Sequence, residues 1–486
     1  MSQASTVHSD SHRWQALIVL CLGVLMIVLD GTVVNVALPS IRSDLNFSEA
    51  ALAWVVNAYM LTFGGFLLLG GRLGDLFGHR RLFLIGIAWF TLASLACGVA
   101  NSQTFLIVAR GTQGFGAAVV SAVALSLIMD LFAEPGERAK AMGVYGFVCA
   151  GGGSVGVLLG GLLTSLLSWH WIFLINIPVG IAVYAFSMKL VPNMKGSGTA
   201  KHLDVGGAIS ITAAMMLAVF AIVNANSVGW LSTQTVGSFL IVALLLAAFL
   251  WIESTVRAPL MPLGLFRRRN IAVANVTAVF WAAAMFAWFF MSALYLQLVL
   301  HYTPMQVGLA FLPANVIMAL FSLGLSAKLV MRFGIRVPMA AGLVIAACGL
   351  LLFARSPVDG RFLTDVLPGM VLLGFGAGIA FNPLLLAAMS DADPSDSGLA
   401  SGMVNTAFMM GGAVGLAVLA SIASLRTRQL GSAGTDTLSA LTGGYQAAFL
   451  VGACSAILAA VVGTSLLRVR AMANGQSAAP AISEFH

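Results

Sequence analysis

Residues 29–39 read Leu-Asp-Gly-Thr-Val-Val-Asn-Val-Ala-Leu-Pro, and they place one carboxylate, Asp30, inside an otherwise apolar segment. The apolar segment 15–38 is long enough to cross a bilayer at about 1.5 Å per residue. A charged side chain at the centre of a membrane-spanning helix costs about 2.5–3.5 kcal/mol, so such residues usually face the protein interior or a wet cavity. Asp30 therefore predicts a polar site inside a membrane protein, and proton transfer is the first role that we expect of it.

The composition of the whole chain is that of a protein with many membrane spans. Of its 486 residues, 60% are hydrophobic and 8% are charged, against about 25% charged residues in soluble domains. The net charge of +7 comes from basic residues spread along the chain at the ends of apolar segments, which favours a topology signal over nucleic-acid binding. Fourteen apolar segments reach spanning length, near 15–38, 52–71, 82–100, 104–129, 141–164, 171–190, 205–225, 236–252, 271–296, 306–327, 337–354, 366–389, 401–424 and 446–467.

The basic residues of the loops predict how these spans are oriented. If the N-terminus is cytoplasmic, eighteen of the 24 Lys and Arg residues lie on the cytoplasmic side, five lie on the other side, and Arg110 falls within a span. This strong positive-inside bias places both termini in the cytoplasm. We expect a multi-pass protein of a bacterial cytoplasmic (inner) membrane.

Two sequence patterns recur at a nearly fixed distance along the chain. The loop 71–80, Gly-Arg-Leu-Gly-Asp-Leu-Phe-Gly-His-Arg, returns as 327–336, and the glycine pattern of 152–156 returns at 411–415, offsets of 256 and 259 residues. Six spans are too short for these offsets, so spans seven and eight form an insert between two six-helix bundles, and transporters of this type bind substrate near the midplane between repeats. The expected parts are a cytoplasmic tail 1–14, a first bundle 15–192, a linker with two inserted helices 193–270, a second bundle 271–468 and a cytoplasmic tail 469–486.

Four stretches carry a family resemblance. The stretch 29–39 matches a first-span signature, 71–81 is similar to a loop between spans two and three, 110–118 resembles a fourth-span arginine motif, and 169–180 resembles the entry into span six. Together they resemble the fourteen-span drug:proton antiporters of the major facilitator superfamily. The resemblance implies an all-α major facilitator fold with 14 transmembrane helices. It also implies a proton-coupled antiporter, not an enzyme, that exports hydrophobic or cationic drugs by alternating access.

Asp30 and Arg110 are the candidate proton-coupling residues. Counted from the outer ends of spans one and four, their depths agree within about one helical turn, and an unpaired guanidinium at that depth is expensive. Protonation of Asp30 would weaken such a pair and free Arg110 to hydrogen bond elsewhere, for instance to Gln113. The alternatives are a static ion pair that joins two helices, or a structural aspartate capped by Thr32 or Asn35.

The loop between spans two and three is the candidate conformational latch. Asp75 can pair with Arg72 or face the positive end of a helix, and Arg80 can reach Asp130 at the inner end of span four. Breaking and remaking these contacts would bias the inward- and outward-facing states. The alternative is ordinary topogenic charge in a tight turn.

Span five carries a stripe of glycines at helical spacing. Gly152, Gly156 and Gly160 lie at i, i+4 and i+8, with Gly161 beside them, and such a groove lets a neighbouring helix approach closely. The resembled family has a proline where this chain has Val157, so we expect the glycine face without the proline bend. The alternative to a role in antiport is a simple packing face.

The candidate substrate-binding residues are large apolar, aromatic or amide side chains in spans that line the cleft of similar transporters. Aromatic faces and thioethers suit varied hydrophobic or cationic ligands, whereas most aromatic residues in spans simply pack or anchor at interfaces. The candidates are Asn57, Tyr59, Phe63, Phe147, Trp281, Phe286, Trp288, Tyr295, Asn315, Asn382, Asn405, Phe408 and Met409.

Other functional classes lack their motifs. The sequence has no GxxxxGK[ST] loop for ATP and no HExxH metal site, so we expect no metal and no cofactor, with protons as the coupling ion. The expected partners are a small-molecule substrate and the lipid bilayer, with no nucleic acid, and the protein is expected to work as a monomer. Two rival classes stay open: a same-fold exporter of a lipid, siderophore or self-made antibiotic, and a membrane sensor that does not transport.

Overall fold

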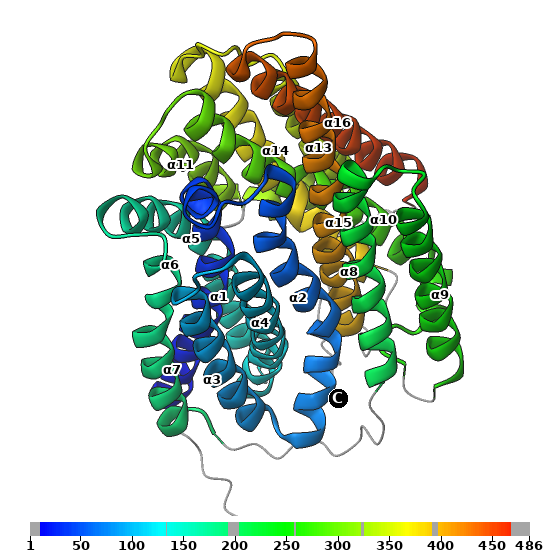
Figure 1. Ribbon diagram of the computed structural model, residues 1–486. Helices are drawn as coiled ribbons and strands as arrows, with labels where there is room; N and C mark the ends of the chain where they lie inside the picture. The colour runs from blue at the N-terminus through cyan, green and yellow to red at the C-terminus, as the bar shows by residue number, and fades with distance from the viewer. Residues whose placement is uncertain are drawn as a thin grey trace, which may run out of the picture.

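The computed structural model describes residues 10–132, 134–192, 204–256, 259–321, 325–390 and 397–467, and the regular elements in these ranges are helices (Figure 1). The helices of the first half pack on one another: α1 contacts α4, α5 and α7, and α3 contacts α4 and α7. Their bounds are α1 (Asp10–Leu45), α2 (Glu49–Phe77), α3 (His79–Gly98), α4 (Gln103–Leu131), α5 (Pro135–Leu166), α6 (Trp171–Leu174) and α7 (Asn176–Leu190).

The second half forms a similar group, with α10 packed against α14, α15 and α16. Two further helices, α8 (Val205–Val228) and α9 (Thr233–Thr255), come between the halves in the sequence. The second-half elements are η1 (Leu263–Arg267), α10 (Arg269–Leu294), η2 (Tyr295–Val299), α11 (Pro304–Leu320), α12 (Ser326–Phe333), α13 (Arg336–Phe353), η4 (Phe362–Val366), α14 (Leu367–Met389), α15 (Ser397–Ser432) and α16 (Thr437–Leu466).

The expected count of fourteen membrane helices is confirmed. In the described part of the chain, twelve helices are long and apolar enough to span a membrane, and α6 and α7 count among them as one span, Trp171–Leu190. The other two spans are α5 and α11, whose qualifying apolar segments are shorter. The first span is longer than the sequence predicts, because α1 continues through Pro39 to Leu45.

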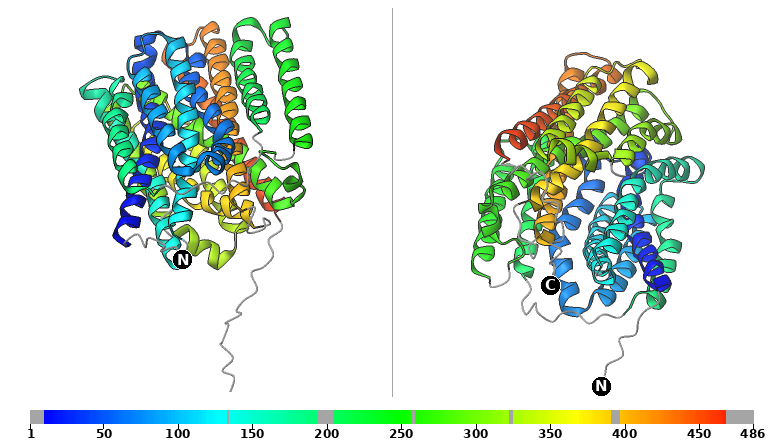
Figure 2. Two further views of the ribbon diagram at one scale, coloured as in Figure 1. Left: turned by 90° about the horizontal axis from the view of Figure 1, so that it is seen from below. Right: turned by 180° about the vertical axis from the view of Figure 1, so that it is seen from behind.

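The inserted pair lies at the seam between the two halves. Helix α8 contacts α2 of the first half and α15 of the second, and α9 packs on α8 at the periphery (Figure 2). The hydroxyl of Ser421 on α15 donates a hydrogen bond to the carbonyl of Ile222 on α8 (3.4 Å), and the guanidinium of Arg428 donates to the carbonyl of Asn226 (2.9 Å). The insert therefore touches both halves rather than extending one of them.

The sequence repeat is also a repeat of backbone geometry. Gly78 between α2 and α3 has φ +91°, and Gly334 between α12 and α13 has φ +74°. The amide of each donates to the carbonyl four residues earlier, Gly74 (2.9 Å) and Val330 (2.8 Å). Positive φ favours glycine, so both halves turn between their second and third spans at the same glycine-dependent position.

The glycine stripe of α5 packs against α1. A Cβ atom at Gly152 would press on Val28, one at Gly156 would overlap the hydroxyl of Thr32, and one at Gly160 would lie 2.7 Å from the carbonyl oxygen of Val33. These close approaches are those that a small-residue groove permits. In the second half, the repeated glycines of α15 pack against α10 in the same way.

Gly161 faces a different neighbour. A Cβ atom at this position would lie 2.6 Å from the carbonyl oxygen of Pro304, the first residue of α11. The stripe therefore brings α5 against α1 within the first half, and its last glycine brings α5 against the second half.

Candidate functional site

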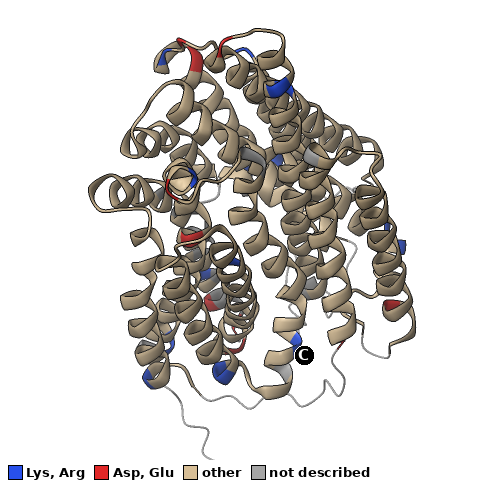
Figure 3. Ribbon diagram, in the orientation of Figure 1, with Lys and Arg blue, Asp and Glu red and all other residues tan. Residues whose placement is uncertain are grey.

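Charged residues are rare inside the helices. Figure 3 shows that most acidic and basic positions lie at helix ends and in the loops. Asp30 is an exception, with 1% of its surface exposed near the middle of α1. Arg110, in the third turn of α4, is fully buried. The structure brings these two candidate residues together.

The carboxylate of Asp30 accepts hydrogen bonds from three side chains. Nη1 of Arg110 lies 2.6 Å from Oδ2, and both amide nitrogens, Nε2 of Gln113 (2.8 Å) and Nδ2 of Asn176 (3.0 Å), donate to Oδ1. Hydrogen bonds to an ionised group are stronger than those between neutral groups. The geometry therefore suits a carboxylate whose charge is balanced by one guanidinium and two amides.

Arg110 has further partners besides Asp30. Its Nε donates to the carbonyl of Val55 on α2 (3.0 Å), and its Nη1 also reaches Oε1 of Gln113 (2.7 Å). The guanidinium carbon lies 4.2 Å from the ring centroid of Tyr59, within the range of a cation–π interaction. Gln113 already contacts Arg110 in the ion-paired state. This contact therefore does not depend on protonation of Asp30, which differs from the prediction made from the sequence.

One hydroxyl, that of Ser94, holds both amides in place. The hydroxyl of Ser94 on α3 accepts from Gln113 (3.1 Å) and from Asn176 (3.0 Å), and it donates to the carbonyl of Phe173 (2.9 Å). Sequence reasoning missed Ser94 and Asn176. The signal for Asn176 was its place in the motif 169–180, where it is the first residue of α7.

A cavity of about 800 Å³ opens beside this network. Its wall includes Thr32, Tyr59 and Arg110 at the depth of the ion pair, and it continues past Arg72 and Ser126 toward the end of the bundle where α2 meets α3. We call this end the α2–α3 end. Ligand pockets in proteins typically measure about 300–1,000 Å³, so the cavity can hold a drug-sized molecule.

The two halves meet at the opposite end of the cavity. The Gln297 side chain donates to the carbonyl of Val36 (2.8 Å), and the Met305 amide donates to the hydroxyl of Ser165 (3.1 Å). Both contacts join a helix of the first half to the second half. In this conformation the halves touch just beyond Asn35, the last residue of α1 on the cavity wall, and the cavity extends from there toward the α2–α3 end.

The substrate candidates divide between the cavity wall and the helix core. Seven of them line the cavity, from both halves: Tyr59, Phe63, Phe286, Asn315, Asn405, Phe408 and Met409. Phe147 lies outside the described side chains. Five described candidates do not line it: Asn57, Trp281, Trp288, Tyr295 and Asn382.

The candidates on α10 and η2 that miss the cavity meet other parts of the second half instead. Trp281 and Trp288 are fully buried, and Trp288 packs against Phe289 and Phe311. The hydroxyl of Tyr295 donates to the carbonyl of Pro357 (2.7 Å) in the second half. Because α10 is surrounded by α14, α15 and α16, most of its large side chains meet other helices rather than the cavity.

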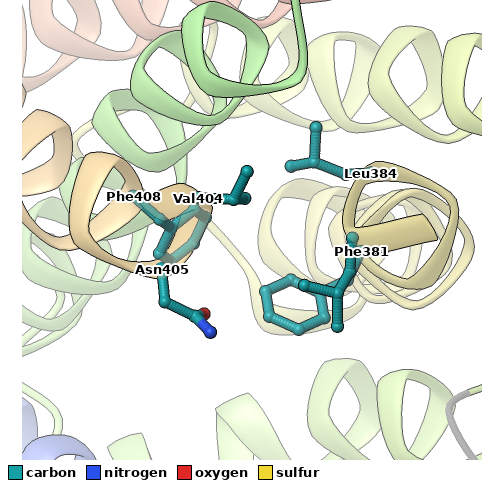
Figure 4. Close-up of a pocket in the computed structure, with 6 residues that line it drawn as sticks. Phe381, Leu384, Val404, Asn405 and Phe408 are labelled. Atoms are coloured by element: carbon teal, nitrogen blue, oxygen red, sulfur yellow. The ribbon is translucent and has the colours of Figure 1, made fainter. Parts of the chain in front are cut away.

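A small recess opens from the second-half wall between α14 and α15. Figure 4 shows the Asn405 amide and the Phe381 ring extending from the two helices, with Val404, Leu384 and Phe408 around them. Phe381, Asn405 and Phe408 also line the main cavity. The recess is therefore a side pocket of the same site, with one amide among apolar groups.

The latch contacts differ in part from those expected. Asp130 pairs with His79, whose Nδ1 lies 3.0 Å from Oδ2, whereas the guanidinium of Arg80 donates to the carbonyl of Met188 on α7. Arg80 and His79 are adjacent in the first turn of α3 and point about 100° apart, which explains why only one of them reaches α4. Arg72 lines the cavity, and the side chain of Asp75 lies outside the described residues.

Comparisons with known proteins agree with this architecture. Residues 20–416 match the sequence profile of the Major Facilitator Superfamily. The chain is 37% identical to the puromycin resistance protein of Streptomyces alboniger, over 98% of this chain and 95% of that protein. It is also 37% identical to the cephamycin export protein of Amycolatopsis lactamdurans, over 96% and 95%. The xylose transporter XylE from E. coli has a similar fold, with a TM-score of 0.62 at 14% identity, over 94% of this chain and 98% of that one.

Proposed function

The chain belongs to the Major Facilitator Superfamily, and from that premise we propose that it is a proton-coupled antiporter that exports small drug-like molecules. Its relatives are transporters that export antibiotics or confer resistance to them, not enzymes. The observation that carries the proton coupling is the buried Asp30–Arg110 pair, because it places a titratable group directly behind the wall of a ligand-sized cavity.

In this proposal, protonation of Asp30 links the ion pair to the orientation of the two halves. When a proton binds Asp30, the carboxyl loses its charge and its attraction for Arg110 weakens. Arg110 keeps the carbonyl of Val55 and the amide oxygen of Gln113 as acceptors, so its charge stays partly compensated. The altered balance between α1 and α4 then favours one orientation of the two halves, and release of the proton favours the other.

The energy of one proton is sufficient for modest accumulation. Moving one charge across 100 mV yields about 2.3 kcal/mol, and a difference of one pH unit adds about 1.4 kcal/mol. The sum of about 3.7 kcal/mol supports a gradient of several hundredfold for a neutral substrate. With one acid in the site, we expect about one proton per cycle.

The same proposal includes the orientation of the protein in the membrane. The α2–α3 end, to which the cavity extends, is the end that the loop charges assign to the cytoplasm. The structure then corresponds to an inward-facing state that receives substrate from the cytoplasm or the inner leaflet. We place the protein in a bacterial cytoplasmic membrane with both termini inside, acting as a monomer.

Transport into everted membrane vesicles tests the proposal. Puromycin and a cephamycin are supplied outside, a proton gradient is imposed, and uptake and dissipation of the gradient are measured together. We expect at least one compound to enter and to dissipate the gradient, and we expect Asp30→Asn to abolish both. Unchanged proton-driven uptake in Asp30→Asn would remove Asp30 from the mechanism.

A second candidate function is export of a self-made metabolite. The similarity to a cephamycin export protein favours it. The two functions are separated by deleting the gene: drug export predicts lower resistance to added compounds, whereas metabolite export predicts that a secreted product accumulates inside the cell.

A further inference from the structure

Two buried acidic residues meet in the inserted helices, away from the Asp30 site. Asp204 is the N-cap residue of α8, and Glu253 lies in the last turn of α9. The two residues are 4% and 3% exposed, and neither lines the cavity. Acidic residues are rarely buried without a partner, because removing a charge from water is costly. The proposed function gives no reason for this pair.

One oxygen of each carboxyl group accepts a hydrogen bond from the backbone. The amide of Gly207 donates to Oδ1 of Asp204 (2.6 Å), and the amide of Met261 donates to Oε2 of Glu253 (3.1 Å). Within the described part of the chain, the other two oxygens, Oδ2 of Asp204 and Oε1 of Glu253, are buried without a hydrogen-bond partner. The backbone therefore holds both carboxyl groups in place and leaves one oxygen of each unsatisfied.

The two unsatisfied oxygens lie together beside Gly207. A Cβ atom at Gly207 would be 2.6 Å from Oδ2 of Asp204 and 2.9 Å from Oε1 of Glu253, so the oxygens are separated by no more than the sum of these distances. The two carboxyl groups are close enough for a hydrogen bond between them. Two carboxylates can only accept, whereas a carboxylic acid can donate. A single proton between the two oxygens would therefore give both of them a partner.

The described surroundings contain no basic group that compensates two negative charges. Asp204 is the described charged group that acts on Glu253. Arg72 of α2 lines the cavity, and Arg428 of α15 donates to the carbonyl of Asn226 near the other end of α8. The basic residues nearest in the sequence lie outside the described residues: Lys201, His202 and Arg257. Because two ionised carboxylates repel each other in a buried place, the arrangement favours the retention of one proton.

We infer that Asp204 and Glu253 bind one proton between them and form a second proton site, at the α2–α3 end of the insert. Ala208 and Leu260, close to the two acids in the sequence, pack with Leu69 in the later part of α2. The shared proton ties the start of α8 to the end of α9 where α8 leans on α2. Since neither acid lines the cavity, this proton is separate from the one exchanged at Asp30.

Infrared spectroscopy of the purified full-length protein at neutral pH tests the shared proton, because carboxylic acids and carboxylates absorb at different frequencies. The variants are Asp204→Asn, which keeps a good N-cap residue, and Glu253→Gln, which keeps an acceptor for Met261. In each variant the remaining carboxyl group faces an amide that can donate, so it ionises. We expect both variants to lose the same carboxylic-acid band, and the double variant to lose no more than either one.

Glu137→Gln is the matched control. The Glu137 carboxylate lies 3.0 Å from the guanidinium of Arg13, so it is ionised and its removal should leave the carboxylic-acid bands unchanged. The sharing is refuted if neither Asp204→Asn nor Glu253→Gln removes a band, or if the band persists in one of them, because one acid would then hold the proton alone. Asp30→Asn should retain the band, so this outcome is separate from that of the vesicle experiment.

The pH dependence of unfolding gives a second readout. The folded pair holds a proton that separate carboxyl groups of the unfolded chain release at neutral pH, so unfolding becomes more favourable as the pH rises. From neutral to mildly alkaline pH, the unfolding equilibrium constant of the wild-type protein should rise more steeply than that of either variant, by up to about tenfold per pH unit. Denaturant unfolding in detergent measures this difference. The same pH dependence in all three proteins would contradict the shared proton.

Discussion

Asp30 is the residue on which the site is built, because donors from α4 and α7 converge on its carboxylate. Each donor is itself held: Gln113 and Asn176 both reach the hydroxyl of Ser94. A buried network of this kind is stable only while its members stay satisfied. Removing a neutral member therefore affects the charged pair at its centre.

Asn176→Leu tests this dependence. The substitution removes one donor to Asp30 and one to Ser94, and hydrogen bonds to charged groups contribute about 1.5–3 kcal/mol. We expect the free energy of unfolding to fall by about that amount, measured by denaturant unfolding of the purified protein in detergent. Ser187→Ala on the same helix is the control, because Ser187 is buried and its hydroxyl has no partner. Equal stability of the two variants would contradict the network.

At this scale, the sequence predicts the place of the charged residues in the site better than that of the neutral ones. The contact of Asp30 with Arg110 was expected because a lone charge in a membrane span is expensive. Asn176 and Ser94 carry no such penalty, and the one sequence signal for them was the place of Asn176 in the motif 169–180. The sequence predicts Arg80, rather than His79, as the partner of Asp130, because the direction of adjacent side chains depends on helix rotation, which the sequence leaves open.

Among the elements, α5 packs closely against two neighbours. Its glycines admit α1 along one face and α11 at Gly161. The sequence predicts this face because its glycines recur every four residues. It does not predict which neighbours fill the groove, because many pairs of helices satisfy the same pattern.

Gly156→Ala should disturb the contact between α5 and α1. The added Cβ atom would overlap the hydroxyl of Thr32, so we expect lower thermal stability and slower export, with partial rescue by Thr32→Ala in the double variant. Gly153→Ala is the matched control, since its Cβ atom would lie 4.0 Å from the nearest atom, on Thr32. The packing account fails if Gly153→Ala is as harmful as Gly156→Ala.

Helix α10 shows where prediction from patterns ends. The sequence favours Trp281 and Trp288 as cavity residues because both are large side chains within the span 271–296. A helix that is apolar on all sides gives no periodic signal for the face that meets a cavity. The positions of its side chains follow from the packing of three neighbouring helices, which only the structure supplies.

For the molecule as a whole, the sequence predicts the architecture correctly: fourteen spans, two bundles and two inserted helices. Those features follow from the length of apolar segments and from an internal repeat. The conformation and the place of the insert were not predictable. Contacts such as Gln297 with Val36 and Ser421 with Ile222 join segments far apart in the chain.

A disulfide across the closed end tests alternating access. The Met305 amide lies 3.1 Å from the Ser165 hydroxyl, so cysteines at both positions are close enough to be linked. Oxidation of the Ser165→Cys/Met305→Cys variant should stop export because α5 and α11 can no longer separate, and a reductant should restore it. The single variants, treated identically, should retain export. Full export by the cross-linked protein would mean that this end does not open.

The central claim is that protonation of Asp30 is exchanged for substrate binding. Proton release by the purified protein in weakly buffered detergent solution measures this exchange directly, when a transported compound is added. We predict release of about one proton per substrate bound in the wild-type protein, and none in Asp30→Asn even when the substrate still binds. Equal proton release from the two proteins would contradict the account.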